Sequence, residues 1–139
     1  MSGRGRAVSA ALLTIAMLAP AAGHGQASSD KASSDKTGQA ALASAGAAAF
    51  QNDLGCGSCH FKDSTFGPPL EGVAGHDIAS VKGFLYSAAL KAKAGNWTDA
   101  NLDAFLTNPQ GFAPGTEMDA SVEDPAQRRE VIAYLKTLK

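Results

Sequence analysis

The chain has 139 residues, of which 45% are hydrophobic and 18% charged, and these values are typical of a single globular domain. Twelve Lys and Arg residues against 13 Asp and Glu residues give a formal net charge of -1, which leaves no broad basic surface for a nucleic acid. Two cysteines are too few for a Cys-rich zinc site or a disulfide framework. They predict one disulfide, a redox pair or a covalent attachment.

Residues 1–27 are predicted to form a secretory signal peptide. Two arginines precede the apolar run Ala7–Ala19, which is shorter than the roughly 20 residues that a membrane span needs. Small residues then follow in a pattern typical of signal cleavage, and we expect the cut within residues 21–27. A retained membrane anchor is the alternative. Cleavage would leave an exported, periplasmic protein without a membrane span.

The next segment, residues 28–41, is predicted to be a flexible linker. Residues 27–36 are two tandem copies of Ala-Ser-Ser-Asp-Lys, which contain nothing apolar larger than alanine, so the stretch cannot offset the entropy of ordering. The folded domain is therefore expected to span residues 42–139. Its first helix is predicted over residues 40–52, where alanine is frequent.

The pentapeptide from Cys56 to His60 has the sequence Cys-Gly-Ser-Cys-His, which is the attachment signal of a c-type haem. One turn of helix brings both sulfurs to one porphyrin edge and places His60 beside the iron. A thioredoxin-like redox pair and a structural disulfide are the rivals, but the domain lacks the alternating strands of a thioredoxin-like fold. A zinc site is disfavoured because only His76 remains as a further good ligand.

The iron needs a sixth ligand, and Met118 is the leading candidate. It is the only methionine left after signal cleavage, and it follows a Pro-Gly pair in a segment that reads as a loop. Met118 as an apolar core residue and His76 as the ligand are the alternatives. Methionine ligation predicts a moderately high reduction potential, because axial ligands set the potential over a range of about 0.8 V.

Two later helices have recognisable starts. Thr98 is predicted to cap a helix over residues 99–107, which must stop before Asn108-Pro109. Asp124 precedes Pro125, a residue favoured at the first helical position, and apolar residues of the segment that follows share one face. These helices, with the first one, predict an all-α domain.

The order and spacing of these features resemble the soluble mono-haem class I cytochromes c over residues 46–139. The matching residues, in chain order, are Gly46, Phe50, Cys56 to His60, Gly67-Pro68, Leu70, Gly72, Trp97, Leu102, Phe105, Leu106, Asn108-Pro109, Pro114 to Met118, and Ile132 to Leu135. The resemblance implies an all-α cytochrome c fold, a small helical shell with long loops around one covalently bound haem. It also implies that Gly46 and Phe50 cross the last helix near Tyr134 and Leu135.

The resemblance assigns further residues to the haem. The carbonyl of Pro68 is expected to accept a hydrogen bond from His60, Trp97 to meet a haem propionate, and Tyr86 and Ser87 to lie near the propionates. Trp97 as plain core filler, and Gly67-Pro68 as a simple turn, are the alternatives. Among the departures from the family, Leu54-Gly55 reads as a small insertion, and Phe105 stands where many members carry a tyrosine.

These features favour a monomeric single-electron carrier with transient protein redox partners and no catalytic residues. A haem enzyme or gas-sensing subunit with a labile sixth ligand is the alternative, and a CxxC thiol oxidoreductase is the third. Residues 42–139 carry eight basic and eleven acidic side chains, so the basic ring of the mitochondrial proteins is missing. This balance favours a neutral or basic partner, or docking led by apolar contact.

Overall fold

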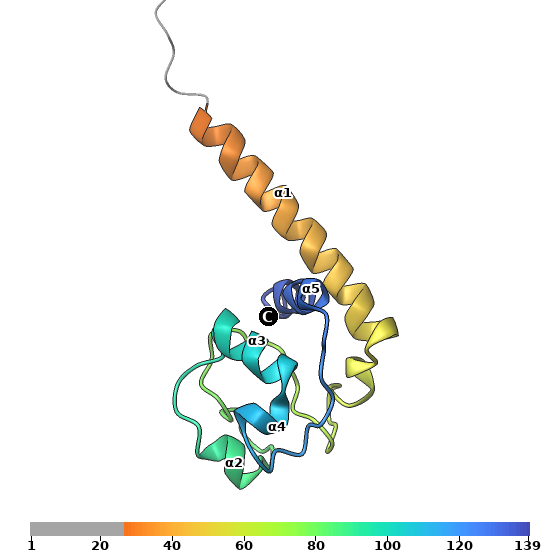
Figure 1. The fold of residues 1–139 in the computed structure, drawn as a ribbon, viewed down its shortest axis with the longest axis vertical. Coiled ribbons are helices and arrows are strands. Elements are labelled where there is room, and N and C mark those ends of the chain that lie inside the picture. Colours follow the sequence, from red (N-terminus) through yellow and green to blue (C-terminus); the bar gives the residue numbers. More distant parts are fainter. Residues whose placement is uncertain (1–26) are drawn as a thin grey trace, which may run out of the picture.

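The computed structural model describes residues 27–139, and these residues form an all-α fold without a β-strand, as expected (Figure 1). The longer helices are α1 (Ala27–Ala48), α3 (Asp99–Thr107) and α5 (Pro125–Leu135). The shorter ones are the π-helix η1 (Ala49–Asp53), the 3-10 helix η2 (Cys56–Ser58), α2 (Ala88–Lys91) and α4 (Pro109–Phe112). Long loops connect them. The predicted signal peptide falls outside the described residues, except for Ala27 at the start of α1.

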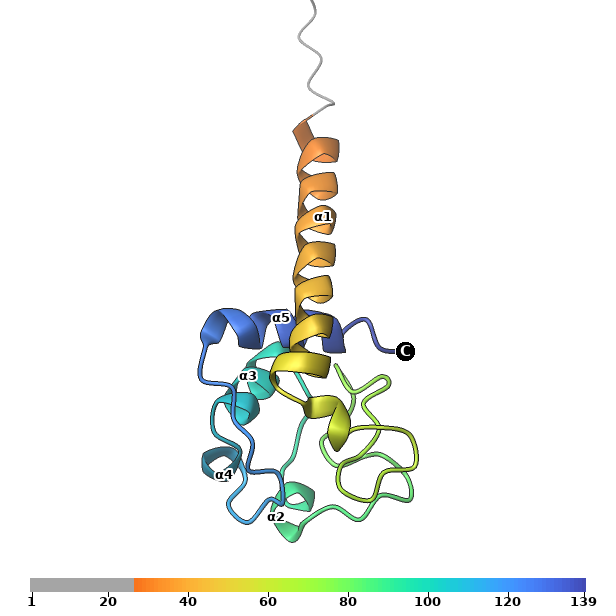
Figure 2. The ribbon, with the colours of Figure 1, turned by 90° about the vertical axis from the view of Figure 1, so that its right-hand side faces the viewer.

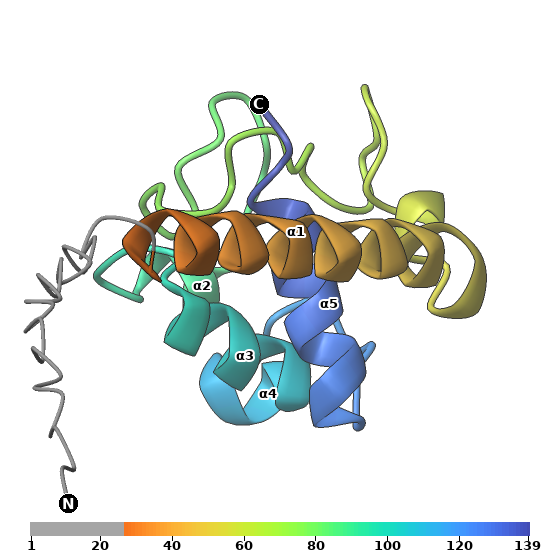
Figure 3. The ribbon, with the colours of Figure 1, turned by 90° about the horizontal axis from the view of Figure 1, so that it is seen from above.

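The second half of α1 crosses α5, as Figures 2 and 3 show. The backbones meet at Gly46: a Cβ atom there would lie 1.9 Å from the carbonyl oxygen of Glu130 and 3.0 Å from Cβ of Tyr134. One turn later, the rings of Phe50 and Tyr134 pack at 5.3 Å between centroids. The expected crossing of Gly46 and Phe50 with the last helix is therefore present, and only glycine permits so close an approach.

The structure differs from our expectation for residues 28–41, since α1 begins at Ala27 and includes them. Alanine and lysine favour the helix, and no glycine or proline interrupts the tandem repeat. Figure 2 shows the first half of α1 projecting away from the other helices, and the side chains of residues 35–42 are exposed. A helix made of small and polar residues therefore occupies the place of the expected linker.

The first helix also ends differently from a regular α-helix, as the two additional residues before the pentapeptide suggested. In η1 the amide of Leu54 donates to the carbonyl of Ala49 at 2.9 Å, which widens the last turn, and Gly55 then adopts a left-handed conformation with φ of 62°. The wider turn fits the longer separation of Phe50 from Cys56.

The predicted starts of the two later helices are confirmed. The hydroxyl of Thr98 accepts from the amide of Asn101 at 3.2 Å at the start of α3, and the carboxylate of Asp124 accepts from the amide of Ala126 at 2.9 Å at the start of α5. Side chains from both helices form the core with Phe50 from η1. The buried apolar residues contributed by α3 and α5 are Leu102, Phe105, Leu106, Val131, Ile132, Ala133 and Leu135.

Within the part of the chain that the structure describes, no helix combines the length and the apolar character that crossing a membrane requires.

Candidate functional site

A cavity of about 590 Å³ lies between the helices and the loops, within the size range of small-molecule and cofactor pockets. Helices α3 and α5 contribute apolar walls, and the loops between residues 54 and 87 and residues 116–120 close the other sides. All eight residues that the sequence predicts for cofactor binding line this one cavity: Cys56, Cys59, His60, Pro68, Tyr86, Ser87, Trp97 and Met118. The fold therefore brings together residues that are up to 62 positions apart in the chain.

Cys56 and Cys59 are carried by one tight turn. The carbonyl of Cys56 accepts from the amides of Cys59 at 3.2 Å and of His60 at 2.9 Å, so the three side chains are held in a fixed order at the cavity. Both cysteines are free, and Cys59 is exposed. Burial raises the pKa of the Cys56 thiol, and the neighbouring Cys59 raises it further.

His60 has one ring nitrogen fixed and one available. Its Nδ1 lies 2.8 Å from the carbonyl oxygen of Pro68. A carbonyl can only accept, so Nδ1 carries the proton and donates, and the lone pair remains on Nε2. This is the bond expected between these two residues. It depends on Gly67, where a Cβ atom would lie 2.8 Å from two atoms of the His60 ring. An imidazole oriented in this way is prepared to bind a metal.

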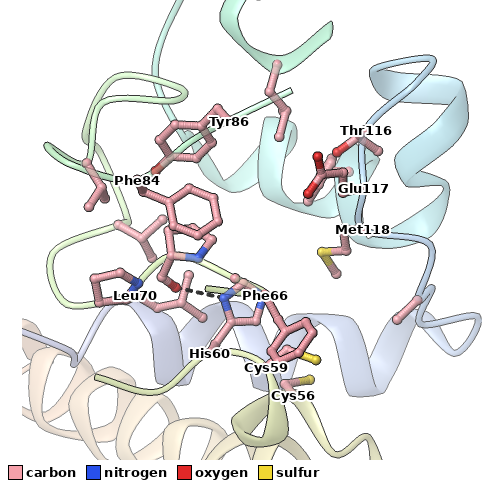
Figure 4. Close-up of a pocket in the computed structure, with 18 of the residues that line it drawn as sticks. Cys56, Cys59, His60, Phe66, Leu70, Phe84, Tyr86, Thr116, Glu117 and Met118 are labelled. Atoms are coloured by element: carbon pink, nitrogen blue, oxygen red, sulfur yellow. Dashed lines mark hydrogen bonds between the residues drawn. The ribbon is translucent and has the colours of Figure 1, made fainter. Parts of the chain in front are cut away.

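Met118 lies on the loop that follows α4, and a side chain of α4 fixes that loop. The amide nitrogen of Gln110 donates to the carbonyl of Thr116 at 2.8 Å, while its oxygen accepts from the amide of Gly115 at 3.1 Å. The half-buried Met118 points its sulfur into the cavity toward the side that carries His60 (Figure 4). The rival ligand His76 also lines the cavity, but it is exposed and its ring lies against Gly72.

Polar groups gather at the end of the cavity away from the two cysteines, where Figure 4 shows Tyr86 and Thr116. Ser87 lines the cavity next to Tyr86 in the chain, and its oxygen accepts from the amide of Leu90 at 3.3 Å, which leaves its proton free to donate. The hydroxyl of Thr116 is buried without a hydrogen-bond partner among the described residues. Such an unpaired group costs free energy unless a ligand satisfies it.

Sequence reasoning did not single out Thr116. Its position two residues before Met118 indicated that it lies near the cofactor. The burial of its hydroxyl and the lack of a hydrogen-bond partner are visible only in the folded structure. Burial also raises the pKa of Tyr86, against the smaller lowering by a hydrogen bond with the backbone of Val81. A neutral phenol at this end of the cavity keeps a proton that it can donate to an anionic group.

An aromatic cluster holds Trp97. Its ring lies 5.1 Å from that of Phe105 and 5.8 Å from that of Phe112, measured between centroids, and the ring of Phe112 is nearly parallel to it. Trp97 is buried, with 9% of its surface exposed, and lines the cavity. Core packing and contact with a ligand are thus combined in this residue.

The donor set fits a haem and does not fit a bare metal ion. Among residues 27–139, no group of three His, Cys, Asp or Glu side chains is close enough to hold an ion. A haem needs two thiols at one edge, an oriented imidazole, an apolar slot, and donors for its carboxylates. Each of these requirements has a residue in the cavity.

Comparison with known proteins leads to the same family. No protein-family model matches the chain. It is 39% identical over 127 residues to a cytochrome c homolog of Bradyrhizobium diazoefficiens, which covers 84% of this chain and 67% of that protein. It is 45% identical over 86 residues to the cytochrome c-type cyt cy of Rhodobacter capsulatus, which covers 60% of this chain and 43% of that protein. The chain thus matches only part of the length of these bacterial relatives.

The solved structure of cytochrome cH from Methylobacterium extorquens superposes with a TM-score of 0.63 and 38% sequence identity, and the match covers 68% of this chain and 97% of that one. Both the fold and the sequence therefore agree with the pentapeptide. The chain belongs to the cytochrome c family: it is a mono-haem class I cytochrome c, with Cys56 and Cys59 spaced for the covalent attachment of haem c.

Proposed function

We propose that the protein is a single-electron carrier in which His60 and Met118 would hold the haem iron. The observation that carries this proposal is that His60, with Nδ1 committed to Pro68, and Met118 both point into the cavity that Cys56 and Cys59 edge. The bound haem supplies a one-electron couple between ferrous and ferric iron. With both side chains holding the iron, no position would remain for a substrate, and we therefore assign the protein no catalytic residues.

The remaining residues set the surroundings of the cofactor. Trp97, Tyr86 and Ser87 would donate hydrogen bonds to the haem carboxylates, and the unpaired hydroxyl of Thr116 would be a fourth donor at the same end of the cavity. The hydrogen bond from His60 to Pro68 fixes the plane of the imidazole. Apolar residues from α3 and α5 exclude water, which favours rapid electron transfer because little solvent must reorganise.

Ligand identity is tested by replacing Met118. In Met118→Ala the reduction potential falls by about 0.2 V or more, since the axial ligand controls a range of about 0.8 V. The sulfur-to-iron charge-transfer band of the oxidised protein disappears as well. His76→Ala is the control and retains both properties. If the reduction potential falls in His76→Ala and is unchanged in Met118→Ala, His76 is the ligand and our assignment is wrong.

Two assays on the native protein test the class of function. A pyridine haemochrome spectrum of the denatured chain reports covalent haem, which a thiol oxidoreductase lacks. Carbon monoxide then distinguishes the carrier from a haem enzyme or gas sensor. With Met118 bound, the reduced protein takes up carbon monoxide slowly, whereas rapid binding would favour the enzyme or sensor with a labile sixth ligand.

Export and partners complete the proposal. Residues 1–27 direct the chain to the periplasm and are removed within residues 21–27, and residues 28–41 separate this signal from the cytochrome domain at 42–139. The apolar run Ala7–Ala19 after two arginines supports this arrangement. The mature protein is a monomer that forms transient complexes with protein redox partners. Mass spectrometry of the protein from a periplasmic extract gives the cleavage site.

A further inference from the structure

Acidic residues are unevenly distributed in this chain. Residues 94–127 contain no Lys, Arg or His, while six Asp and Glu residues occur there: Asp99, Asp103, Glu117, Asp119, Glu123 and Asp124. The segment runs through α3 and α4 to the loop that carries Met118. A stretch of one sign produces a local field that the formal net charge of -1 does not reveal.

Ion pairs neutralise only the α3 end of this segment. Asp99 bonds Lys136 at 2.8 Å, and Asp103 bonds Arg128 at 2.8 Å. Among the described residues, no ion pair includes the acidic side chains on either side of Met118, Glu117 and Asp119. Glu123 and Asp124 have no ion pair in the described part of the chain either, but of these four unpaired carboxylates only Glu117 and Asp119 line the cavity.

Glu117 and Asp119 are exposed and also line the cavity, which places them at its rim. Phe66 belongs to the rim by the same reasoning, because it lines the cavity while 76% of its surface is exposed. Its loop is tied to the attachment turn: the hydroxyl of Ser64 donates to the carbonyl of Cys59 at 2.5 Å and accepts from the amide of Phe66 at 3.1 Å. A large exposed aromatic side chain is thus held beside the exposed Cys59.

We propose that Phe66, Glu117 and Asp119 form the docking rim for the redox partner, and that the partner is a protein with an apolar centre ringed by Lys and Arg. The proposal rests on the proposed function, since electrons must cross at the edge of the cavity. Small redox interfaces use complementary charge to orient the encounter, and an exposed aromatic group supplies contact area. A second copy of this chain and an anionic lipid surface would both be repelled by the two carboxylates.

Small redox complexes test the charge of the rim without knowledge of the natural partner. The reduced holoprotein is oxidised in stopped flow by tris(phenanthroline)cobalt(III), a cation, and by hexacyanoferrate(III), an anion, over a range of ionic strength. The rate constant for oxidation by the cation is expected to fall about tenfold or more from low to high salt, whereas the rate constant for the anion is expected to rise. In the variant Glu117→Gln with Asp119→Asn, most of this salt dependence disappears.

The matched control for charge is Asp35→Lys. It changes the net charge by the same amount, two units, at an exposed position on the projecting half of α1. This variant keeps the salt dependence of the native protein. Equal effects of the control and the rim variant would overturn the proposal, because net charge alone would then explain the rates. If the double variant fails to fold, Glu117→Gln alone is measured, and about half of the change in salt dependence is expected.

The contact made by Phe66 is tested by comparing a redox complex that has aromatic rings with one that has none. Phe66→Ser slows oxidation by the phenanthroline complex about threefold, as expected for loss of aromatic stacking, and leaves reduction by hexaammineruthenium(II), a cation without aromatic rings, unchanged. Phe61→Ser is the control, since Phe61 is 48% exposed but does not line the cavity. Equal slowing by both aromatic variants contradicts the assigned rim. Failure of every complex to exchange electrons would instead overturn the proposed function.

Discussion

Replacement of Gly46 by alanine is expected to destabilise the protein, because Gly46 lies against the backbone of Glu130. The same substitution at another glycine of α1 is expected to have the opposite effect. A Cβ atom on Gly46 would lie 1.9 Å from the Glu130 carbonyl oxygen, and real Cβ atoms essentially never come closer than 3.0 Å. Helices α1 and α5 must therefore separate by about 1.1 Å, which is 3.0 Å less 1.9 Å. The clashing atom belongs to the backbone of α5, so rotation of a side chain cannot relieve it.

The cost follows from the lost packing. A gap of this size forfeits about half of the dispersion energy of each contact at the crossing, including that of Phe50 with Tyr134. Overpacking typically costs about 1–3 kcal/mol. Alanine recovers about 1 kcal/mol of helix propensity relative to glycine. Because the clashing atom is backbone, the upper part of the overpacking range applies, about 2–3 kcal/mol, and the propensity gain leaves a destabilisation of about 1–2 kcal/mol for Gly46→Ala. Gly46→Val is expected to destabilise the protein more.

The same substitution at Gly38 is the control, because nothing lies within 4 Å of a Cβ atom there and both glycines belong to α1. Gly38→Ala keeps only the propensity gain, so stability rises by up to about 1 kcal/mol. Thermal unfolding of the holoproteins followed by circular dichroism measures the difference, with Gly46→Ala lowering Tm by about 5–15 °C. Equal Tm values for the two alanine variants would refute the close crossing.

Two further predictions concern Arg128 and Tyr86. The buried Arg128 guanidinium donates to the carbonyls of Val122 and Glu123 and to Asp103, so Arg128→Met is expected to cost about 2–4 kcal/mol in denaturant titrations. Asp103→Asn costs about 1 kcal/mol or less, because its side chain is 47% exposed and solvent screens the pair; equal costs would contradict this. Burial raises the pKa of Tyr86 above its ordinary value of 10.0, so the folded state holds the phenolic proton more tightly than the unfolded state and stability falls as the pH rises above 10.0. Tyr86→Phe reduces this decline in Tm measured from pH about 9 to about 11, and an unchanged decline would show that other groups cause it.

Much of the site could be predicted because its information is local in the chain. The pentapeptide Cys56 to His60 is one turn of backbone, so the spacing alone relates its thiols to its imidazole. The caps Thr98 and Asp124 act within three residues of themselves, and both are found where the pattern indicated. Met118 was identified by counting methionines, and its place at the cavity agrees with that identification.

Other features depend on segments that meet only in the folded chain. The extension of α1 over residues 28–41 was not expected, because the helix propensity of this segment is too weak to form a helix by itself. The second half of α1 packs against α5, and this packing stabilises a helix that the first half can extend. The buried hydroxyl of Thr116 is visible only when the cavity is formed.

Sequence by itself determined the chemistry of attachment, because covalent geometry and hydrogen bonds within one turn act between neighbours in the chain. Tertiary structure alone decided where charge and apolar surface meet at the cavity. Arg128 of α5 and Lys136 directly after it pair with Asp103 and Asp99 of α3, whereas Glu117 and Asp119 have no ion pair among the described residues. This selection requires α3 and α5, which are separate in the sequence, to pack side by side.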